Sequence, residues 1–303
     1  NSIDVQTAAG TSPIGIGLET GSLNISVTRN NITRVVTSST GGWGGRGIVV
    51  GTGSATSNIT IANNFITGVN GSNYTAFGNS SSMGIAIGMI GTSSTLTTTA
   101  GGINIYHNTV NMYCSYSYSG ATLTAAMYVG SGASALNVQN NIFVNSMNNT
   151  NASGTGAKNY TLYSAAANTA FSSINYNDYY VSGTQGVMAF LTSDRTNLAG
   201  VIAGFGGNAN SVNIAPNFNS ATDLHLNPGT NSTLDNTGTP IAAVTIDYDG
   251  AARSATTPDM GADEFATLTC ATQTLVAGTV SSTVSSFCNT TSGATISANG
   301  YTI

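Results

Sequence analysis

The sequence repeats one eight-residue pattern four times, as ISVTRNNI (25–32), ITIANNFI (59–66), INIYHNTV (103–110) and LNVQNNIF (136–143). Each copy reads apolar-x-apolar-x-x-Asn-x-apolar, and the asparagines are Asn30, Asn64, Asn108 and Asn141. They lie 34, 44 and 33 residues apart. Because repeats of about 20 to 50 residues are typical of solenoids, we expect each copy to belong to one solenoid turn.

A second short element precedes each copy and keeps step with it. It is a small residue followed by apolar-x-apolar, as in GIVV (47–50) and GIAI (84–87). Both elements alternate with period two and are rich in Ile and Val, which is typical of strands with alternate side chains facing inward. The sequence therefore predicts an all-β chain folded as a right-handed parallel β-helix, a solenoid of about five to seven coils.

The repeated asparagine has a structural role in such a fold. Successive strands stack about 4.8 Å apart, so each asparagine lies over the next and their amides can hydrogen-bond in a ladder. Asn also tolerates left-handed backbone at a corner. After Asn141 the pattern weakens to an echo at Ile174, Tyr176 and Asn177, and the segment 191–206 contains the one stretch that suits a short helix.

Composition restricts the class of partner. Only 6% of residues are charged, against about 25% in ordinary soluble domains. Six basic residues against eleven acids leave no basic patch able to neutralise several phosphates, which argues against nucleic acid. We find no apolar run long enough to insert in a membrane and no signal-peptide pattern, and we expect the chain to be excised from a longer one.

Cysteine spacing suggests one disulfide. Cys270 and Cys288 lie 18 residues apart in a segment of strand-like alternation, whereas Cys114 stands far upstream. We predict that the first pair forms a disulfide in an oxidising compartment and that Cys114 is a buried, small apolar residue.

The C-terminal half carries a resemblance to a known group of proteins. The stretch IDYDGAARSATTPDMGADEF (246–265), with APNFNS (215–220) and DLHLNPG (223–229) before it, resembles the closing motif of β-helix proteins secreted by Bacteroidota. Residues 270–303 resemble the opening half of an Ig-like repeat in large adhesins of that phylum. The resemblance implies a β-helix domain over 1–265, the start of an Ig-like module over 266–303, and an extracellular, type IX-secreted surface protein whose partners include its own neighbouring domains.

Acidic residues concentrate in that motif. Asp247, Asp249, Asp259, Asp263 and Glu264 fall within 18 residues, with Arg253 among them. Such carboxylates on glycine-containing turns can hold a structural Ca²⁺, although no full EF-hand loop is present. The alternative, which we favour, is that Arg253 forms salt bridges with some of them and the segment caps the end of the solenoid.

Residues for catalysis are sparse. Between 14 and 190 the acids are only Glu19 and Asp178, whereas glycoside hydrolysis needs two carboxylates on one face. A lyase needs a base, and the candidates are Arg29 and His107, which precede Asn30 and Asn108 in equivalent positions and so lie along one outer face. We interpret His107, and likewise His225, as solvated.

Aromatic residues offer a binding surface instead. Trp43 lies in a glycine-rich loop, and Tyr113, Tyr116 and Tyr118 lie in an excursion between repeats. Exposed rings can stack on sugars, while the alternative is that these rings pack beneath loops. We therefore predict a non-catalytic adhesin module without a catalytic cofactor that binds glycans or surfaces and acts as a rigid spacer; the alternatives are a polysaccharide lyase or hydrolase and a purely structural stalk.

Overall fold

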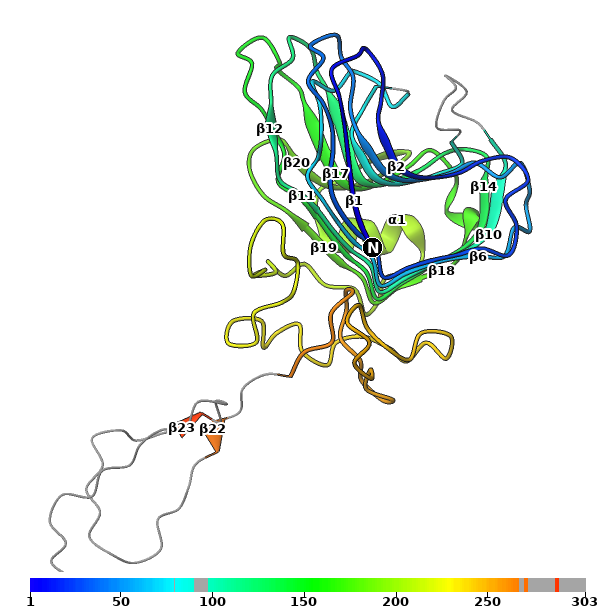
Figure 1. The fold of residues 1–303 in the computed structure, drawn as a ribbon, viewed down its shortest axis with the longest axis vertical. Coiled ribbons are helices and arrows are strands. Elements are labelled where there is room, and N and C mark those ends of the chain that lie inside the picture. Colours follow the sequence, from blue (N-terminus) through cyan, green and yellow to red (C-terminus); the bar gives the residue numbers. More distant parts are fainter. Residues whose placement is uncertain (79, 90–97, 267–269, 272–286, 289–303) are drawn as a thin grey trace, which may run out of the picture.

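The computed structural model describes residues 1–78, 80–89, 98–266, 270–271 and 287–288, and shows a parallel β-solenoid of about five turns. Each coil contributes one strand to each of three sheets, which form three walls around an apolar interior (Figure 1). The predicted all-β solenoid is therefore confirmed, within the lower part of the expected range of coils. No helix among the described residues is both long and apolar enough to cross a membrane.

The strands follow the same order in every coil. Sheet A contains β1 (Ser2–Thr7), β4 (Asn31–Thr37), β7 (Phe65–Thr67), β8 (Val69–Asn70), β11 (Thr109–Met112), β15 (Ile142–Asn145) and β19 (Asp178–Val181). Sheet B contains β2 (Ile14–Leu18), β5 (Arg46–Val50), β9 (Met83–Ile87), β13 (Leu123–Val129), β17 (Lys158–Ser164), β20 (Gly186–Leu191) and the antiparallel β21 (Ser193–Arg195). Sheet C contains β3 (Ser26–Thr28), β6 (Ile59–Ala62), β10 (Ala100–Tyr106), β14 (Ala133–Gln139) and β18 (Phe171–Asn175). A small pair, β12 (Ser115–Tyr116) and β16 (Asn148–Asn149), lies in the connections between sheets A and B.

The repeat pattern sets the register. In sheet C, Ile61 pairs with Ile105 and Ile105 with Val138, and all three side chains are buried. The last apolar residue of each repeat continues the stack in sheet A, where Ile66 pairs with Val110. Like side chain therefore lies on like along the whole core, as period-two strands in parallel register require.

The glycine near the start of β2, β5 and β9 in sheet B is required by packing. A Cβ at Gly47 would lie 2.4 Å from the carbonyl oxygen of Gly84 and 2.6 Å from the Cγ2 of Ile66. Ala126 occupies the equivalent place in the fourth coil, where β13 pairs with β9. A side chain at Gly47 would therefore collide with the next coil, whereas the later coils accommodate Thr161 and Met188 at the equivalent place.

The solenoid ends in a helix. Helix α1 (Leu198–Phe205) begins at Asn197, whose side chain accepts a hydrogen bond from the Gly200 amide (2.8 Å), and ends at Gly206 with φ of 72°. Val201 and Phe205 are buried in the main core, and the Phe205 ring meets that of Phe171 edge-on at 5.4 Å. The helix predicted within 191–206 thus closes the C-terminal end of the core (Figure 1).

The acidic segment, which we define as residues 214–266, does not cap that end. It runs along the outside of the coils at the corner between sheets C and A (yellow to orange in Figure 1). Its Leu226, Leu234 and Met260 bury the outward-facing Ile142 and Val144 of β15. The predicted end cap is therefore wrong, because the outer face of sheet A is itself apolar and needs a cover, while α1 fills the end.

Most of the predicted Ig-like start falls outside the described residues. Within 266–303 the structure describes two short strands, β22 (Cys270–Ala271) and β23 (Phe287–Cys288), which pair antiparallel with Cys270 opposite Cys288. The sulfur atoms of that predicted disulfide lie outside the described part. Cys114, a free thiol, is partly buried against the core.

Candidate functional site

The repeated asparagines form a continuous buried ladder. The Nδ2 of Asn30, Asn64 and Asn108 each donates to the Oδ1 of the next asparagine at 2.9–3.0 Å. Asn141 donates in the same way to Asn177 (2.9 Å), so the weak fifth copy belongs to the ladder. From Asn64 onward each Oδ1 also accepts a backbone amide from the preceding coil, as Asn108 does from Asn64 at 3.2 Å. The amides thus brace the corner and leave no group for a ligand.

The left-handed backbone at this corner lies one residue earlier than we expected. The residues before the ladder are Arg29, Asn63, His107, Asn140 and Tyr176, and their φ angles run from 51° to 59°. The left-handed backbone turns the side chains of these residues outward. The ladder asparagine that follows each of them then faces the inside of the corner. The outward row contains both catalytic candidates, Arg29 and His107.

The acidic segment covers this outward row. Arg29 Nε donates to the carbonyl of Tyr248 (2.7 Å), and Asn63 Nδ2 donates to that of Ile246 (2.7 Å). Asn140 exchanges hydrogen bonds with the backbone of Thr239 at 2.7 and 3.0 Å. The acidic segment therefore buries the row at Asn63, His107 and Asn140, whereas Arg29 stays exposed beside an open pocket.

His107 is buried rather than solvated, which corrects the prediction. Its Nδ1 lies 3.1 Å from the carbonyl oxygen of Asp259, and its Nε2 accepts from Asn140 Nδ2 at 2.9 Å. Nδ1 must therefore carry the proton. Burial, with the nearby charge of Arg253, holds the pKa of His107 well below its ordinary value. A neutral ring with both nitrogens bonded to protein supports the fold and has no free atom for a substrate proton.

Two of the predicted metal ligands are used by the backbone. Asp247 accepts the amides of Gly250 and Ala251 on Oδ1 and that of Glu264 on Oδ2. Asp259 accepts the amides of Asn236 (2.6 Å) and Phe265 (2.8 Å), and burial raises the pKa of its carboxyl to about 7. Both side chains cap turns.

Arg253 forms one salt bridge, with Glu264 (Nη1 to Oε2, 3.1 Å). Its Nη2 donates to Asn63 Oδ1 at 2.8 Å and to the carbonyl of Gly261 at 2.9 Å. The predicted pairing of Arg253 with an acid of the motif therefore takes place through Glu264, and the guanidinium also fastens the segment to the second coil.

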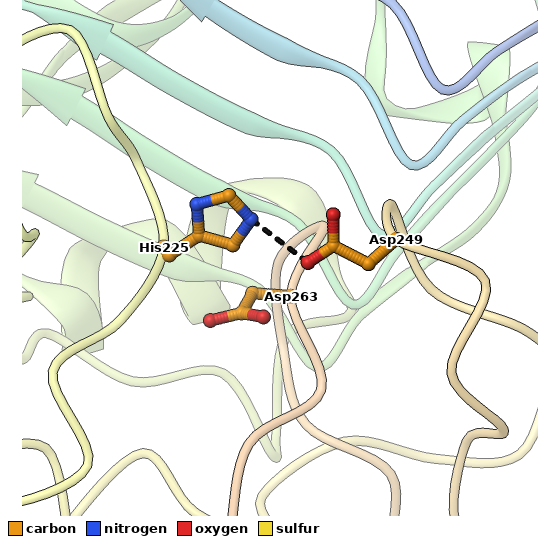
Figure 2. A group of neighbouring side chains, drawn as sticks. All are labelled: His225, Asp249 and Asp263. Carbon is orange, nitrogen blue, oxygen red and sulfur yellow. Dashed lines mark hydrogen bonds and ion pairs between the residues drawn. The ribbon is translucent and has the colours of Figure 1, made fainter.

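The other two acids meet a histidine. One ligand atom each of His225, Asp249 and Asp263 lies within 4.8 Å of the others, and the three side chains come from separate stretches (Figure 2). His225 Nε2 lies 3.0 Å from Asp249 Oδ2, and its Nδ1 hydrogen-bonds to Asp223. The sequence analysis treated His225 as solvated and missed its meeting with these two acids, because 38 residues separate it from Asp263. The alternating run Asp223-Leu224-His225-Leu226, which puts both polar side chains on one side, was the available signal.

His225 is partly buried over an aromatic base. Its ring meets Phe65 of β7 edge-on, with 4.8 Å between centroids, and Tyr248 packs on the same Phe65 at 4.2 Å. Burial disfavours the imidazolium, but the hydrogen bond to Asp223 and the charges of Asp263 and Asp249 outweigh it and raise the pKa of His225. The phenylalanine therefore fixes the position of this cluster on the coils.

One of the four predicted binding aromatics, Tyr118, contacts a further ring, that of Tyr74, and Trp43 lies on the connection of the preceding coil. Trp43, Tyr74 and Tyr118 come from equivalent connections between sheets A and B in three successive coils. A Cβ at Gly42 would lie 2.7 Å from the ring of Tyr74 and 3.4 Å from that of Tyr118, and the two rings meet edge-on at 5.8 Å. A Cβ at Gly41 would lie 3.4 Å from the Trp43 indole nitrogen. We call Trp43, Tyr74 and Tyr118 the aromatic cluster.

The rest of the predicted set lies apart from this cluster. Tyr116 is buried, with its hydroxyl 2.6 Å from Thr122 Oγ1, and so packs beneath the loops. Tyr113 is 36% exposed, and it makes no ring contact with the aromatic cluster among the described residues. Tyr74, at 42%, is the more exposed ring, and sequence reasoning missed it because its partners come from other coils.

The outer face of sheet C is a second polar surface. Register places Ser26, Thr60, Asn104, Asn137 and Ser173 in one column. Asn137 Nδ2 donates to Asn104 Oδ1 (2.8 Å), and the Tyr106 hydroxyl donates to the same oxygen (3.1 Å). The column contains no charged side chain, and an open pocket of about 330 Å³ lies beside Asn104 and Asn137.

Comparison of the chain with protein-family models, with curated proteins and with solved structures finds no match. The parallel β-solenoid fold is therefore what the structure establishes, and no family or homologue identifies the chain.

Proposed function

We propose that this chain is a non-catalytic module of a large extracellular bacterial surface protein that binds uncharged glycans through the aromatic cluster. The observation that carries the proposal is the edge-on contact of Tyr74, 42% exposed, with Tyr118. Trp43 lies on the equivalent connection of the preceding coil. Aromatic rings with part of their surface in solvent are the groups on which sugar rings stack.

The chemistry of the surrounding loops supports a neutral ligand. The connections 38–45, 70–82, 113–122 and 146–157 contain no Asp, Glu, Lys or Arg. They supply hydroxyls, amides and backbone groups, which suit the hydroxyls of a sugar. An anionic polysaccharide would find no cation here, so we infer a neutral one.

The coils support a role as a rigid spacer. A buried amide ladder runs through five coils, and each link is supported by backbone bonds on both sides. Stacked coils form a rigid rod because each coil contacts its neighbours over three sheets. The resemblance of 246–265 to secreted Bacteroidota proteins supports an extracellular setting and a type IX-secreted adhesin.

The test is a neutral-glycan array followed by calorimetry on the full 303-residue chain. Tyr74→Ala and Trp43→Ala are expected to weaken binding at least tenfold, since stacking on one aromatic contributes about 1–3 kcal/mol in comparable ring systems. Tyr106→Ala is the matched control, because that ring lies on sheet C. Equal loss in Tyr106→Ala would place the site on sheet C, and absence of binding across the array would favour a purely structural stalk.

A further inference from the structure

The cluster of His225, Asp249 and Asp263 has the chemistry of a metal centre rather than of a turn. One imidazole nitrogen and two carboxylates converge, with ligand atoms within 4.8 Å of one another (Figure 2). A tetrahedral zinc ion holds N and O ligands at about 2.0–2.2 Å, which puts the ligand atoms themselves a little over 3 Å apart. The observed spacing therefore needs only small side-chain rotations.

The imidazole is already oriented for a cation. Asp223 hydrogen-bonds to Nδ1 of His225, so Nε2 faces Asp249 at 3.0 Å. Carboxylate, histidine and metal in that order is the common arrangement of zinc sites, because the outer carboxylate fixes the tautomer. A metal ion would take the place of the proton that Nε2 shares with Asp249 Oδ2 across this 3.0 Å contact.

The two carboxylates also have room for a cation. Asp263 is 7% exposed, and its Oδ2 accepts the Leu226 amide at 2.8 Å, while none of the hydrogen bonds among the described residues uses its Oδ1. Asp249 has a side chain 59% exposed, and within the described part of the chain its ion-pair partner is His225. An open pocket of about 480 Å³, lined by Asn1, Thr28, Arg29, Tyr248 and Asp249, borders the cluster at Asp249.

We propose that His225, Asp249 and Asp263 bind a divalent transition-metal ion of the zinc type, with Asp223 as the supporting carboxylate. An imidazole ligand favours such an ion over Ca²⁺, which prefers an all-oxygen set. The ion would join three stretches of the acidic segment above Phe65, and so strengthen the cover of the outward row.

The experiment measures Zn²⁺ binding to the full chain by calorimetry at pH 7.5, with Ca²⁺ in a parallel titration. We expect one Zn²⁺ per chain and a rise in melting temperature of several degrees at saturation. Asp249→Asn and His225→Asn should each raise the Kd at least tenfold. His107→Asn is the matched control, since asparagine already occupies the equivalent position at Asn63 and Asn140 and the other histidine is thereby removed.

Two results would overturn the proposal. If Zn²⁺ does not bind, or binds His225→Asn as tightly as the unchanged chain, the cluster is an imidazolium held by carboxylates. If Ca²⁺ binds there and Zn²⁺ does not, the assigned class of ion is wrong. Because the Asp249 side chain is largely exposed, Asp249→Asn folds normally and keeps the test valid even where His225→Asn loses stability. Co²⁺ absorption in the visible range provides an independent readout of a nitrogen–oxygen site.

Discussion

The coils and the acidic segment bury their polar groups in opposite ways. In the coils a neutral side chain, the ladder asparagine, repeats at each turn and bonds to its own copy in the next. In the acidic segment, which holds seven of the eleven acids, single carboxylates collect nearby backbone amides, as Asp247 does from three. In the coils the repeating backbone gives each asparagine a partner one turn away. The irregular backbone of the acidic segment has no such repeat, so its free amides are bound by single carboxylates, which are strong acceptors.

We expect the ladder to be the part of the molecule whose substitution lowers the free energy of unfolding most. Asn108→Ala would leave the Asn64 backbone amide unpaired and would remove one donor from each of the carbonyls of Ile61 and Tyr106 in a buried corner. We expect a loss of about 2–4 kcal/mol in the free energy of unfolding, measured with denaturant. Asn104→Ala, on the outer face of sheet C, is the control and should cost under about 1 kcal/mol. If Asn108→Ala and Asn104→Ala lowered the free energy of unfolding equally, burial of an amide would not determine how much it contributes to stability.

Arg253 tests whether the acidic segment depends on single charges. Arg253→Met should leave Glu264 without its cation and Asn63 without its donor, at a cost of about 2–3 kcal/mol. Hydrogen exchange should show faster amide exchange in 244–265 and little change in the coils. Arg34→Met, which removes the exposed pair with Asp4, should leave exchange unchanged. Faster exchange throughout the coils would show that the two regions unfold as one unit.

His107 links the two regions and should make their association pH-dependent. Its folded pKa is lowered, so below about pH 6.5 the unfolded state takes up a proton that the folded state does not. The free energy of unfolding should therefore fall with decreasing pH, by about 1 kcal/mol at pH 5.5. His107→Asn keeps a residue suited to the left-handed backbone and should remove this part of the slope. An unchanged slope, or a ring that titrates near pH 6.5 by nitrogen-15 NMR, would contradict the buried neutral histidine.

For Asp178 we expect the smallest change in stability, with a pH dependence of opposite sign to that of His107. It is fully buried in β19, its Oδ1 accepts the Ile214 amide, and its Oδ2 has no partner among the described residues. Burial raises the pKa of Asp178, so rising pH above about 4 ionises the unfolded state first and lowers stability. Asp178→Asn should therefore stabilise the chain by about 1 kcal/mol at pH 7.5 and less at pH 4.5, by thermal unfolding. Asp4→Asn is the exposed control, and a destabilised Asp178→Asn would show that the charge is compensated.

The sequence by itself determined the coils and their ladder. Period-two Ile and Val runs with an asparagine at fixed offset predict a parallel solenoid, because each residue's environment is set by its own copy one turn away. The same local reasoning found the helix over 198–205 and the pairing of Arg253 with an acid, and it placed Arg29 and His107 in one outward row.

Only the tertiary structure decided what covers that row and which side chains meet. The acidic segment could not be placed from sequence, since nothing in its spacing shows that it folds back over sheet A at residues more than 100 positions earlier. His225 joins Asp249 and Asp263, and Tyr74 joins Tyr118, through contacts between different coils or loops. A repeat fixes its own interior by stacking like on like, but its outer surface depends on chain that does not repeat.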